Sequence, residues 1–187
     1  YLMKAKQERW SYRELKRQIT SATFERTMLT KEKLSKVSQE TKTNPTSVFK
    51  DSYVLEFLNL PTQHSENQLQ NAIVANLKNF ILEFGRDFAF MGQEYRVQVG
   101  NQDFFIDLLF YHRTLQCLVA IELKTERFAP EHLAQINFYL EALDREVKNE
   151  NENPSIGILL CKGKDDVVVE YALSRTLNPA MVADYQL

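Results

Sequence analysis

The sequence contains 187 residues, of which 44% are hydrophobic and 26% are charged, and its formal net charge at pH 7 is −2. This composition supports a sizeable core, and no apolar run approaches the roughly 18 residues of a membrane-spanning helix. Cys117 and Cys161 lie in apolar runs without a CxxC pair, so we expect reduced core thiols in a cytoplasmic protein. Because the chain starts without Met, we expect it to be part of a longer protein, and the charged start YLMKAKQERW does not resemble a secretory leader.

Charge is divided unevenly along the chain. Residues 1–50 hold 12 Lys and Arg against 5 Asp and Glu, whereas residues 51–187 hold 11 against 20. This division predicts a basic module that contacts phosphates, with Arg13, Lys16 and Arg17 as candidates, joined to an acidic module that holds divalent cations. A solvated, Lys-rich helix without a partner is the alternative interpretation of the basic part.

The first predicted elements are helices. A capping box that begins at Ser11 predicts a helix over residues 11–28, and residues 31–39 form a candidate second helix. A segment rich in Thr, Asn, Pro and Ser then interrupts the helical pattern, and we place a domain boundary there. The prediction is a basic helical N-terminal segment over residues 1–48 and a second domain over residues 49–187.

The second domain begins with a short apolar element, YVLEFLNL, and continues with clearer elements. These are a helix from the capping box at Ser65 to Gly85, strands over 88–100, 104–112 and 115–124, a helix over 130–147 and a strand over 156–161. Residues 167–187 fit either a helix followed by an edge strand or two strands. This order predicts an α/β fold with a mixed sheet flanked by helices.

Three charged residues interrupt two of the most apolar strands: Asp107 in one strand, and Glu122 and Lys124 in the next. An unpaired buried charge is costly, so these side chains must satisfy one another or hold another ion. If the hairpin turns near residues 113 and 114, Asp107 lies opposite Ala120 and diagonal to Glu122. Both carboxylates would then reach a shared cation.

The predicted ligands are all oxygens, which favours Mg²⁺ or Mn²⁺ over zinc. Asp107 and Glu122 supply carboxylates, and the backbone carbonyl of Leu123 is a further candidate. A water beside Lys124 would be placed to attack a phosphodiester, with the lysine orienting or deprotonating it. The alternative is a structural salt bridge that links two strand ends.

Other catalytic motifs are missing from the sequence. It contains no GxSxG, Walker or GxGxxG motif, which leaves the serine-hydrolase, NTPase and dinucleotide-binding classes without support. His64, His112 and His132 show no metal-ligand spacing, and we expect all three on the surface.

Several long strings resemble one family. DFFIDLLFYHRTLQCLVAIELK, QINFYLEAL and ENPSIGILLCKGKDDVVVEYAL are similar to the YhcG-like group of the PD-(D/E)xK nuclease superfamily, and the similarity extends to WSYRELKRQI and MVADYQL. The resemblance implies a restriction-endonuclease-like fold with an αβββαβ core and a helical N-terminal domain that binds DNA. It also implies a Mg²⁺-dependent nuclease of bacterial origin.

The resemblance assigns roles by position. Asp107 matches the motif aspartate, Glu122 the motif acid and Lys124 the motif lysine. Gln135 and Tyr139 resemble the QxxxY element of the RecB-like branch, and their spacing places them on one helical face. A helix-surface amide and a core aromatic residue are the alternatives for this pair.

The first core helix departs from the family pattern. Related nucleases often carry a Glu there that completes the metal shell, whereas this position is Gln70, with Glu66 one turn earlier. Either Gln70 is a weaker ligand, or Glu66 acts through water, or the site holds one metal. Asp103 is a secondary candidate that either hydrogen-bonds the site or caps the following turn.

The expected function is therefore metal-dependent hydrolysis of nucleic-acid phosphodiesters, with DNA as the preferred substrate and RNA as the other possibility. Gln70 favours an alternative, in which a weak or inactive nuclease fold binds DNA or a protein partner within a defence or DNA-processing assembly. No membrane partner is expected, a homodimer or larger assembly stays open, and the expected location is the bacterial cytoplasm.

Overall fold

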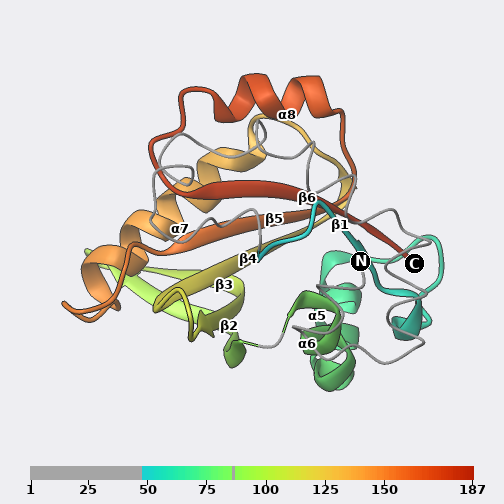
Figure 1. Ribbon diagram of the computed structural model, residues 1–187, viewed down its shortest axis with the longest axis horizontal. Coiled ribbons are helices and arrows are strands. Elements are labelled where there is room, and N and C mark those ends of the chain that lie inside the picture. Colours follow the sequence, from blue (N-terminus) through green and yellow to red (C-terminus); the bar gives the residue numbers. More distant parts are fainter. Residues whose placement is uncertain (1–47, 86) are drawn as a thin grey trace, which may run out of the picture.

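A six-stranded mixed sheet forms the centre of the computed structural model, which describes residues 48–85 and 87–187 (Figure 1). The strand order is β1–β6–β5–β4–β3–β2. The strands β2, β3 and β4 form an antiparallel meander, whereas β4, β5, β6 and β1 run parallel. The bounds are Ser52–Val54 (β1), Phe88–Val99 (β2), Gln102–His112 (β3), Cys117–Arg127 (β4), Ile156–Gly163 (β5) and Ala180–Gln186 (β6).

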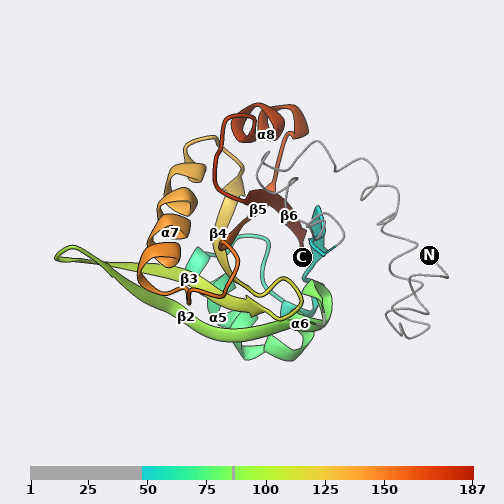
Figure 2. The same ribbon diagram turned by 60° about the vertical axis from the view of Figure 1, so that its left-hand side comes forward.

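Helices cover both faces of this sheet (Figures 1 and 2). Two of them pack on one face and two on the other: Glu66–Ala75 (α5) with Leu77–Phe84 (α6), and His132–Glu146 (α7) with Asp166–Leu173 (α8). Together α5, the meander, α7 and β5 confirm the predicted αβββαβ core. The helices predicted before residue 48 lie outside the described residues.

The predicted helix after Ser65 is two helices. Its start is confirmed, because Ser65 and Gln68 form the expected capping box. The single helix to Gly85 is wrong, since Asn76 leaves the helical conformation with φ −112° and ψ 31°. Its side-chain Nδ2 donates to the carbonyl of Ala72 at 3.0 Å, so a local polar contact accompanies the break between α5 and α6.

The C-terminal segment adopts the first of its two predicted forms, a helix followed by a strand. The strand β6 is not at the edge, however, because the short strand β1 pairs with it in parallel through Ser52↔Asp184 and its neighbours. The apolar element YVLEFLNL supplies part of β1 and the 3-10 turn Glu56–Leu58, η3. Sequence alternation alone gives no sign of this long-range pairing.

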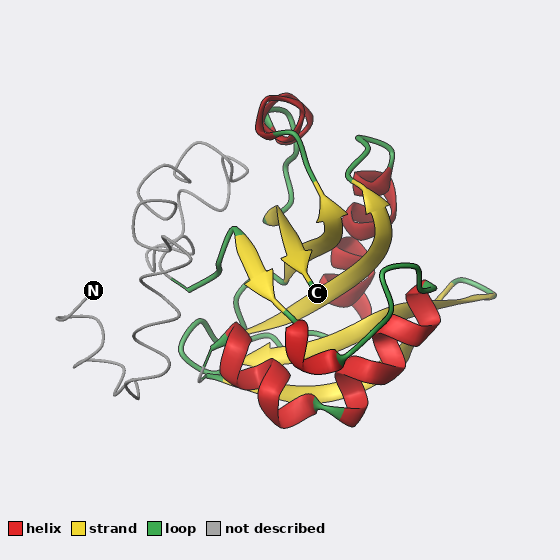
Figure 3. Cartoon of the chain, turned by 90° about the vertical axis from the view of Figure 1, so that its right-hand side faces the viewer, coloured by secondary structure: helices red, strands yellow, loops and turns green. Residues whose placement is uncertain are grey.

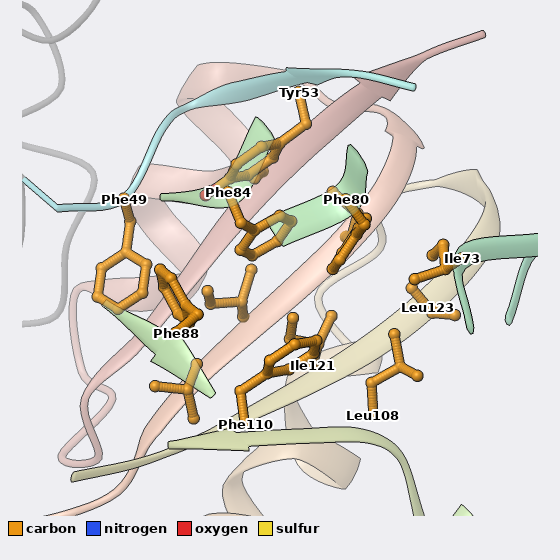
Figure 4. Close-up of a cluster of buried hydrophobic side chains, with 14 of the residues drawn as sticks. Phe49, Tyr53, Ile73, Phe80, Phe84, Phe88, Leu108, Phe110, Ile121 and Leu123 are labelled. Carbon is orange, nitrogen blue, oxygen red and sulfur yellow. The ribbon is translucent and has the colours of Figure 1, made fainter. Parts of the chain in front are cut away.

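Two buried clusters lie on the two faces of the sheet. The cluster under α5 and α6 is rich in aromatic rings, which lie against strands β3 to β5 (Figure 4). Tyr53 and Phe84 stack with ring centroids 4.1 Å apart, and Phe80 lies 4.4 Å from Phe84. Full burial of one large apolar side chain stabilises a fold by about 1.5–3 kcal/mol, so these rings hold α6 against β1 and the rest of the sheet.

The cluster under α7 and α8 depends on a close approach between helix and sheet. A Cβ atom on Gly157 of β5 would lie 2.6 Å from Cγ1 of Ile136 on α7, so only glycine fits there without movement. This contact fixes the height of α7 above β5 and thereby places the residues that α7 directs toward β4.

Other sequence predictions have mixed outcomes. Cys117 and Cys161 are buried and free, as predicted. The surface position predicted for His112 is wrong: it is 3% exposed, and its Nδ1 accepts a hydrogen bond from the backbone N–H of Leu115 at 3.1 Å. Within the part of the chain that the structure describes, no helix is both long and apolar enough to cross a membrane.

Candidate active site

The candidate site lies where β3 and β4 separate. Their paired ladder runs from His112↔Cys117 to Leu108↔Ile121. The predicted register is wrong, because Ala120 pairs with Leu109 rather than with Asp107. The turn spans residues 113–116 and ends at Gln116 in a left-handed conformation with φ 49°, which lengthens the connection beyond the expected turn. Continuing this register beyond the ladder places Asp107 opposite Glu122 rather than diagonal to it.

Hydrogen bonds fix both the side chain and the backbone of Asp107. Its Oδ2 accepts a hydrogen bond from the backbone N–H of Leu123 at 2.8 Å. Its carbonyl accepts one from Nε2 of Gln70 at 2.8 Å, and Gln70 is buried on α5. Gln70 therefore contacts the backbone of Asp107 through its amide nitrogen, which donates hydrogen bonds and does not coordinate cations.

Glu122 and Lys124 form a buried ion pair beside Asp107. Lys124 Nζ lies 3.1 Å from Oε1 of Glu122 and 3.7 Å from Oε2 of Glu66, the first residue of α5. Glu122 is 1% exposed, and its Oε2 is buried with no hydrogen-bond partner among the described residues. An orphaned buried carboxylate oxygen is costly, so this atom marks a place where a further positive group fits.

The site carries more negative than positive charge. The pKa of Glu122 is raised to about 7, chiefly by burial and then by the nearby Asp107 carboxylate, while Lys124 opposes both effects. Burial likewise raises the pKa of Asp107, against the hydrogen bond from Leu123. Burial lowers the pKa of Lys124, but the surrounding carboxylates, Glu122 first, outweigh it and raise the pKa above its ordinary value. One ammonium does not balance this cluster.

The available donors suit a hard divalent cation. Glu122 and Asp107 supply carboxylate oxygens. The Leu123 N–H points toward β3, so the carbonyl of the same residue is directed to that side as well. Among residues 48–85 and 87–187, no group of three or more His, Cys, Asp or Glu side chains is arranged to hold a metal. A cation here would therefore keep several waters, as Mg²⁺ usually does.

Gln135 and Tyr139 lie side by side on α7, as their spacing predicts. Gln135 Nε2 donates to the Tyr139 hydroxyl at 3.0 Å. Burial raises the pKa of Tyr139, the bond from Gln135 opposes this, and the carboxylates of Glu122 and Asp107 add to the rise. Tyr139 thus lies within the electrostatic field of the site, and the hydrogen-bond partner of Gln135 is Tyr139 rather than either carboxylate.

Asp103 is the second residue of β3, next to the turn of the β2–β3 hairpin. This hairpin extends beyond the rest of the sheet (Figures 2 and 3). The Asp103 carboxylate is 2.8 Å from the guanidinium of Arg96 on β2. The structure therefore gives Asp103 a partner on the hairpin and does not bring it to Asp107. Arg13, Lys16 and Arg17 lie outside the described residues.

Glu94 on β2 is a residue that sequence reasoning missed. The pairs Gln93↔Leu108 and Tyr95↔Ile106 flank it, so the register places Glu94 opposite Asp107. Its φ of 45° is unusual for a residue other than glycine, and its charge contributes to the raised pKa of Asp107. The pattern that predicts the strand over residues 88–100 carries no signal of this bend.

Comparison with known proteins identifies the family. The YhcG PDDEXK nuclease domain family matches residues 46–187. A relative named "Putative nuclease YhcG" from Escherichia coli (strain K12) is 37% identical over 182 residues, which are 95% of this chain and 48% of the relative. The chain therefore spans about half the length of that curated relative.

Two solved structures are more distant. A repair endonuclease from Pyrococcus abyssi has a TM-score of 0.44 and 17% identity, over 67% of this chain and 47% of that chain. EndoMS in its apo form has a TM-score of 0.40 and 17% identity, over 66% and 46%. Both TM-scores are low, so these likenesses add nothing to the assignment. On the family match and the 37% identity, the chain belongs to the YhcG PDDEXK nuclease domain family.

Proposed function

We propose that this chain is a metal-dependent nuclease that hydrolyses phosphodiester bonds, with DNA as its substrate. The observation that carries the proposal is the convergence of Asp107, Glu122 and Lys124 where β3 and β4 separate, with the Oε2 atom of Glu122 buried and unpartnered. Membership of a nuclease domain family supports the same chemistry.

Asp107, Glu122 and the carbonyl of Leu123 would hold Mg²⁺ or Mn²⁺. When bound, such a cation supplies positive charge against the scissile phosphate and makes water more acidic. The hydrogen bond from Leu123 fixes the direction of the Asp107 carboxylate, and Gln70 fixes the backbone that carries it. These contacts pre-organise the oxygen ligands before substrate arrives.

Lys124 acts on the reacting phosphate or on the attacking water. Its ammonium is held by Glu122 and Glu66, and the raised pKa keeps it protonated at neutral pH. A protonated lysine stabilises charge that develops on the phosphate, so we assign Lys124 to charge stabilisation and water orientation rather than to proton abstraction. Glu66 positions this ammonium, and Gln135 with Tyr139 borders the site from α7.

The wider setting is part of the same proposal. The basic residues Arg13, Lys16 and Arg17 would bind the DNA backbone from the segment over residues 1–48, and residues 49–187 would form the nuclease domain. A bacterial cytoplasmic location fits the Escherichia coli relative and the two free thiols.

A second candidate function is a catalytically weak or inactive module that binds DNA or a protein partner. It is favoured by the small number of side-chain ligands, since the described residues contain no group of three suited to a metal and Gln70 offers its nitrogen to a backbone carbonyl. Such a module would take up little Mn²⁺.

Plasmid cleavage with Mg²⁺ and calorimetric titration with Mn²⁺ test the proposal together. The wild type should nick or linearise plasmid, and Asp107→Asn should abolish both cleavage and Mn²⁺ uptake. Asp103→Asn is the matched control, because Asp103 lies four residues earlier on the same strand and pairs with Arg96 instead. A wild type that neither cuts nor binds Mn²⁺ would contradict the proposal and favour the second candidate.

A further inference from the structure

The nuclease domain is acidic, so the positions of its unpaired cations indicate where it can meet a polyanion. Ion pairs neutralise five cations of the described residues: Lys50, Arg96, Lys124, Arg145 and Lys164. Other cations in the described ranges make no ion pair: Lys78, Arg113, Arg127, Lys148, Lys162 and Arg175. The second group contains the positive charges that remain available to a ligand.

Two of these cations, Arg127 and Lys162, lie next to the candidate active site. The parallel strands β4 and β5 pair Lys124 with Cys161 and Arg127 with Gly163. Lys162 follows Cys161 directly, and paired strands lie about 5 Å apart, so all three cations occupy the carboxyl ends of two neighbouring strands. Both Arg127 and Lys162 are exposed.

Each of these cations is anchored near the strand ends by one contact with a backbone carbonyl. Lys162 Nζ donates to the carbonyl of Thr62 at 2.6 Å. Thr62 lies four residues before Glu66, and the Glu66 carboxylate is 3.7 Å from Lys124 Nζ. Arg127 donates through Nη2 to the carbonyl of Lys164 at 3.4 Å. An ammonium has three donors and a guanidinium five, so each cation keeps donors free after its one backbone contact.

We propose that Arg127 and Lys162 bind backbone phosphates of the nucleic acid on either side of the bond held at Lys124. This inference rests on the proposed function and adds a phosphate-binding surface within the nuclease domain, separate from the basic N-terminal segment. Arginine and lysine contacts to phosphates position a nucleic-acid strand without reading its sequence. Both side chains suit this role, because they are exposed and each is anchored by a backbone carbonyl.

Salt dependence of binding provides the test, because each phosphate contact to duplex DNA contributes about 0.9 to the slope of log affinity against log salt. The full chain is titrated in EDTA with a short fluorescein-labelled duplex, so that binding is measured without cleavage. The double variant Arg127→Gln, Lys162→Gln should have a slope smaller by about 2. Between 50 and 200 mM salt it should therefore lose about tenfold less affinity than the wild type.

The matched control is Arg113→Gln, Lys148→Gln. It removes the same charge from unpaired cations at the amino ends of β4 and β5, away from the site. The control should keep the wild-type slope, and both double variants should keep the wild-type melting temperature. An unchanged slope in the Arg127 and Lys162 variant, or an equal fall in the control, would overturn the assignment while leaving the nuclease proposal intact. Absence of duplex binding by the wild type in EDTA would also overturn the assignment, whereas plasmid cleavage with Mg²⁺ decides the nuclease proposal separately.

Discussion

Replacement of Glu122 by Gln measures how much the buried charge of Glu122 destabilises the metal-free fold. Glu122 is buried, and its pKa rises from the ordinary 4.5 to about 7 because burial and Asp107 disfavour its charge. Folding therefore takes up a proton between these two values, and the folded state binds more protons than the unfolded state. By linkage, the stability of the metal-free protein falls as pH rises from about 4.5 through 7 and levels off above.

The size of this effect follows from the two pKa values. Between pH 5 and pH 8 the Glu122 carboxyl should cost the metal-free fold on the order of 2–3 kcal/mol. For a chain of this length, 1 kcal/mol corresponds to a change of about 2–4 °C in the melting temperature. Between pH 5 and pH 8 the melting temperature of the wild type should therefore fall by roughly 5–10 °C more than that of Glu122→Gln. The neutral amide introduced by this substitution would resemble the protonated acid, and Glu66 would remain near Lys124.

Thermal melting in EDTA at several pH values measures this difference. Glu170→Gln is the matched control, because Glu170 is exposed on α8, and its profile should follow the wild type. Added Mn²⁺ should reverse the trend, raising the melting temperature of the wild type at pH 8 and leaving Glu122→Gln unchanged, since the cation favours the ionised carboxylate. Parallel profiles for wild type and Glu122→Gln would refute the reasoning.

Three further substitutions test separate parts of the structure. Lys124→Ala should lower plasmid cleavage by about 10²-fold or more, because it removes the charge that faces the phosphate. Duplex binding should change little, and near-wild-type cleavage would contradict the role assigned to Lys124. Phe80→Ala should lower the free energy of unfolding in urea by about 3–5 kcal/mol, because Phe80 is fully buried. Leu82→Ala, at a side chain that is 63% exposed, should change it by no more than about 0.5 kcal/mol. Equal losses in the two variants would contradict the packing. Gly157→Ala should cost about 1–3 kcal/mol because its Cβ meets Ile136, and an unchanged urea midpoint would show that α7 moves freely.

The sequence predicted the elements whose local signals are strong. The capping box at Ser65, the apolar runs of β3 and β4 and the periodicity of α7 each identify one element without reference to the rest of the chain. Charges inside apolar runs likewise singled out Asp107, Glu122 and Lys124, because burial of a charge demands an explanation.

The sequence could not predict features that depend on distant contacts or on single unusual backbone angles. The β3–β4 register depends on Gln116 adopting a left-handed conformation, which a residue other than glycine seldom does. The approach of Glu94 to Asp107 depends on a similar bend. Burial of His112 follows from its packing against Phe88 and Phe49, which come together only in the folded chain.

A crystal soaked in Mn²⁺ and measured for anomalous scattering tests the central claim most directly. A peak about 2 Å from carboxylate oxygens of both Asp107 and Glu122, with the Leu123 carbonyl directed toward it, is the predicted result. Absence of a peak between these groups, with Mn²⁺ bound at other positions in the same crystal, would contradict a metal-dependent nuclease site at the separation of β3 and β4.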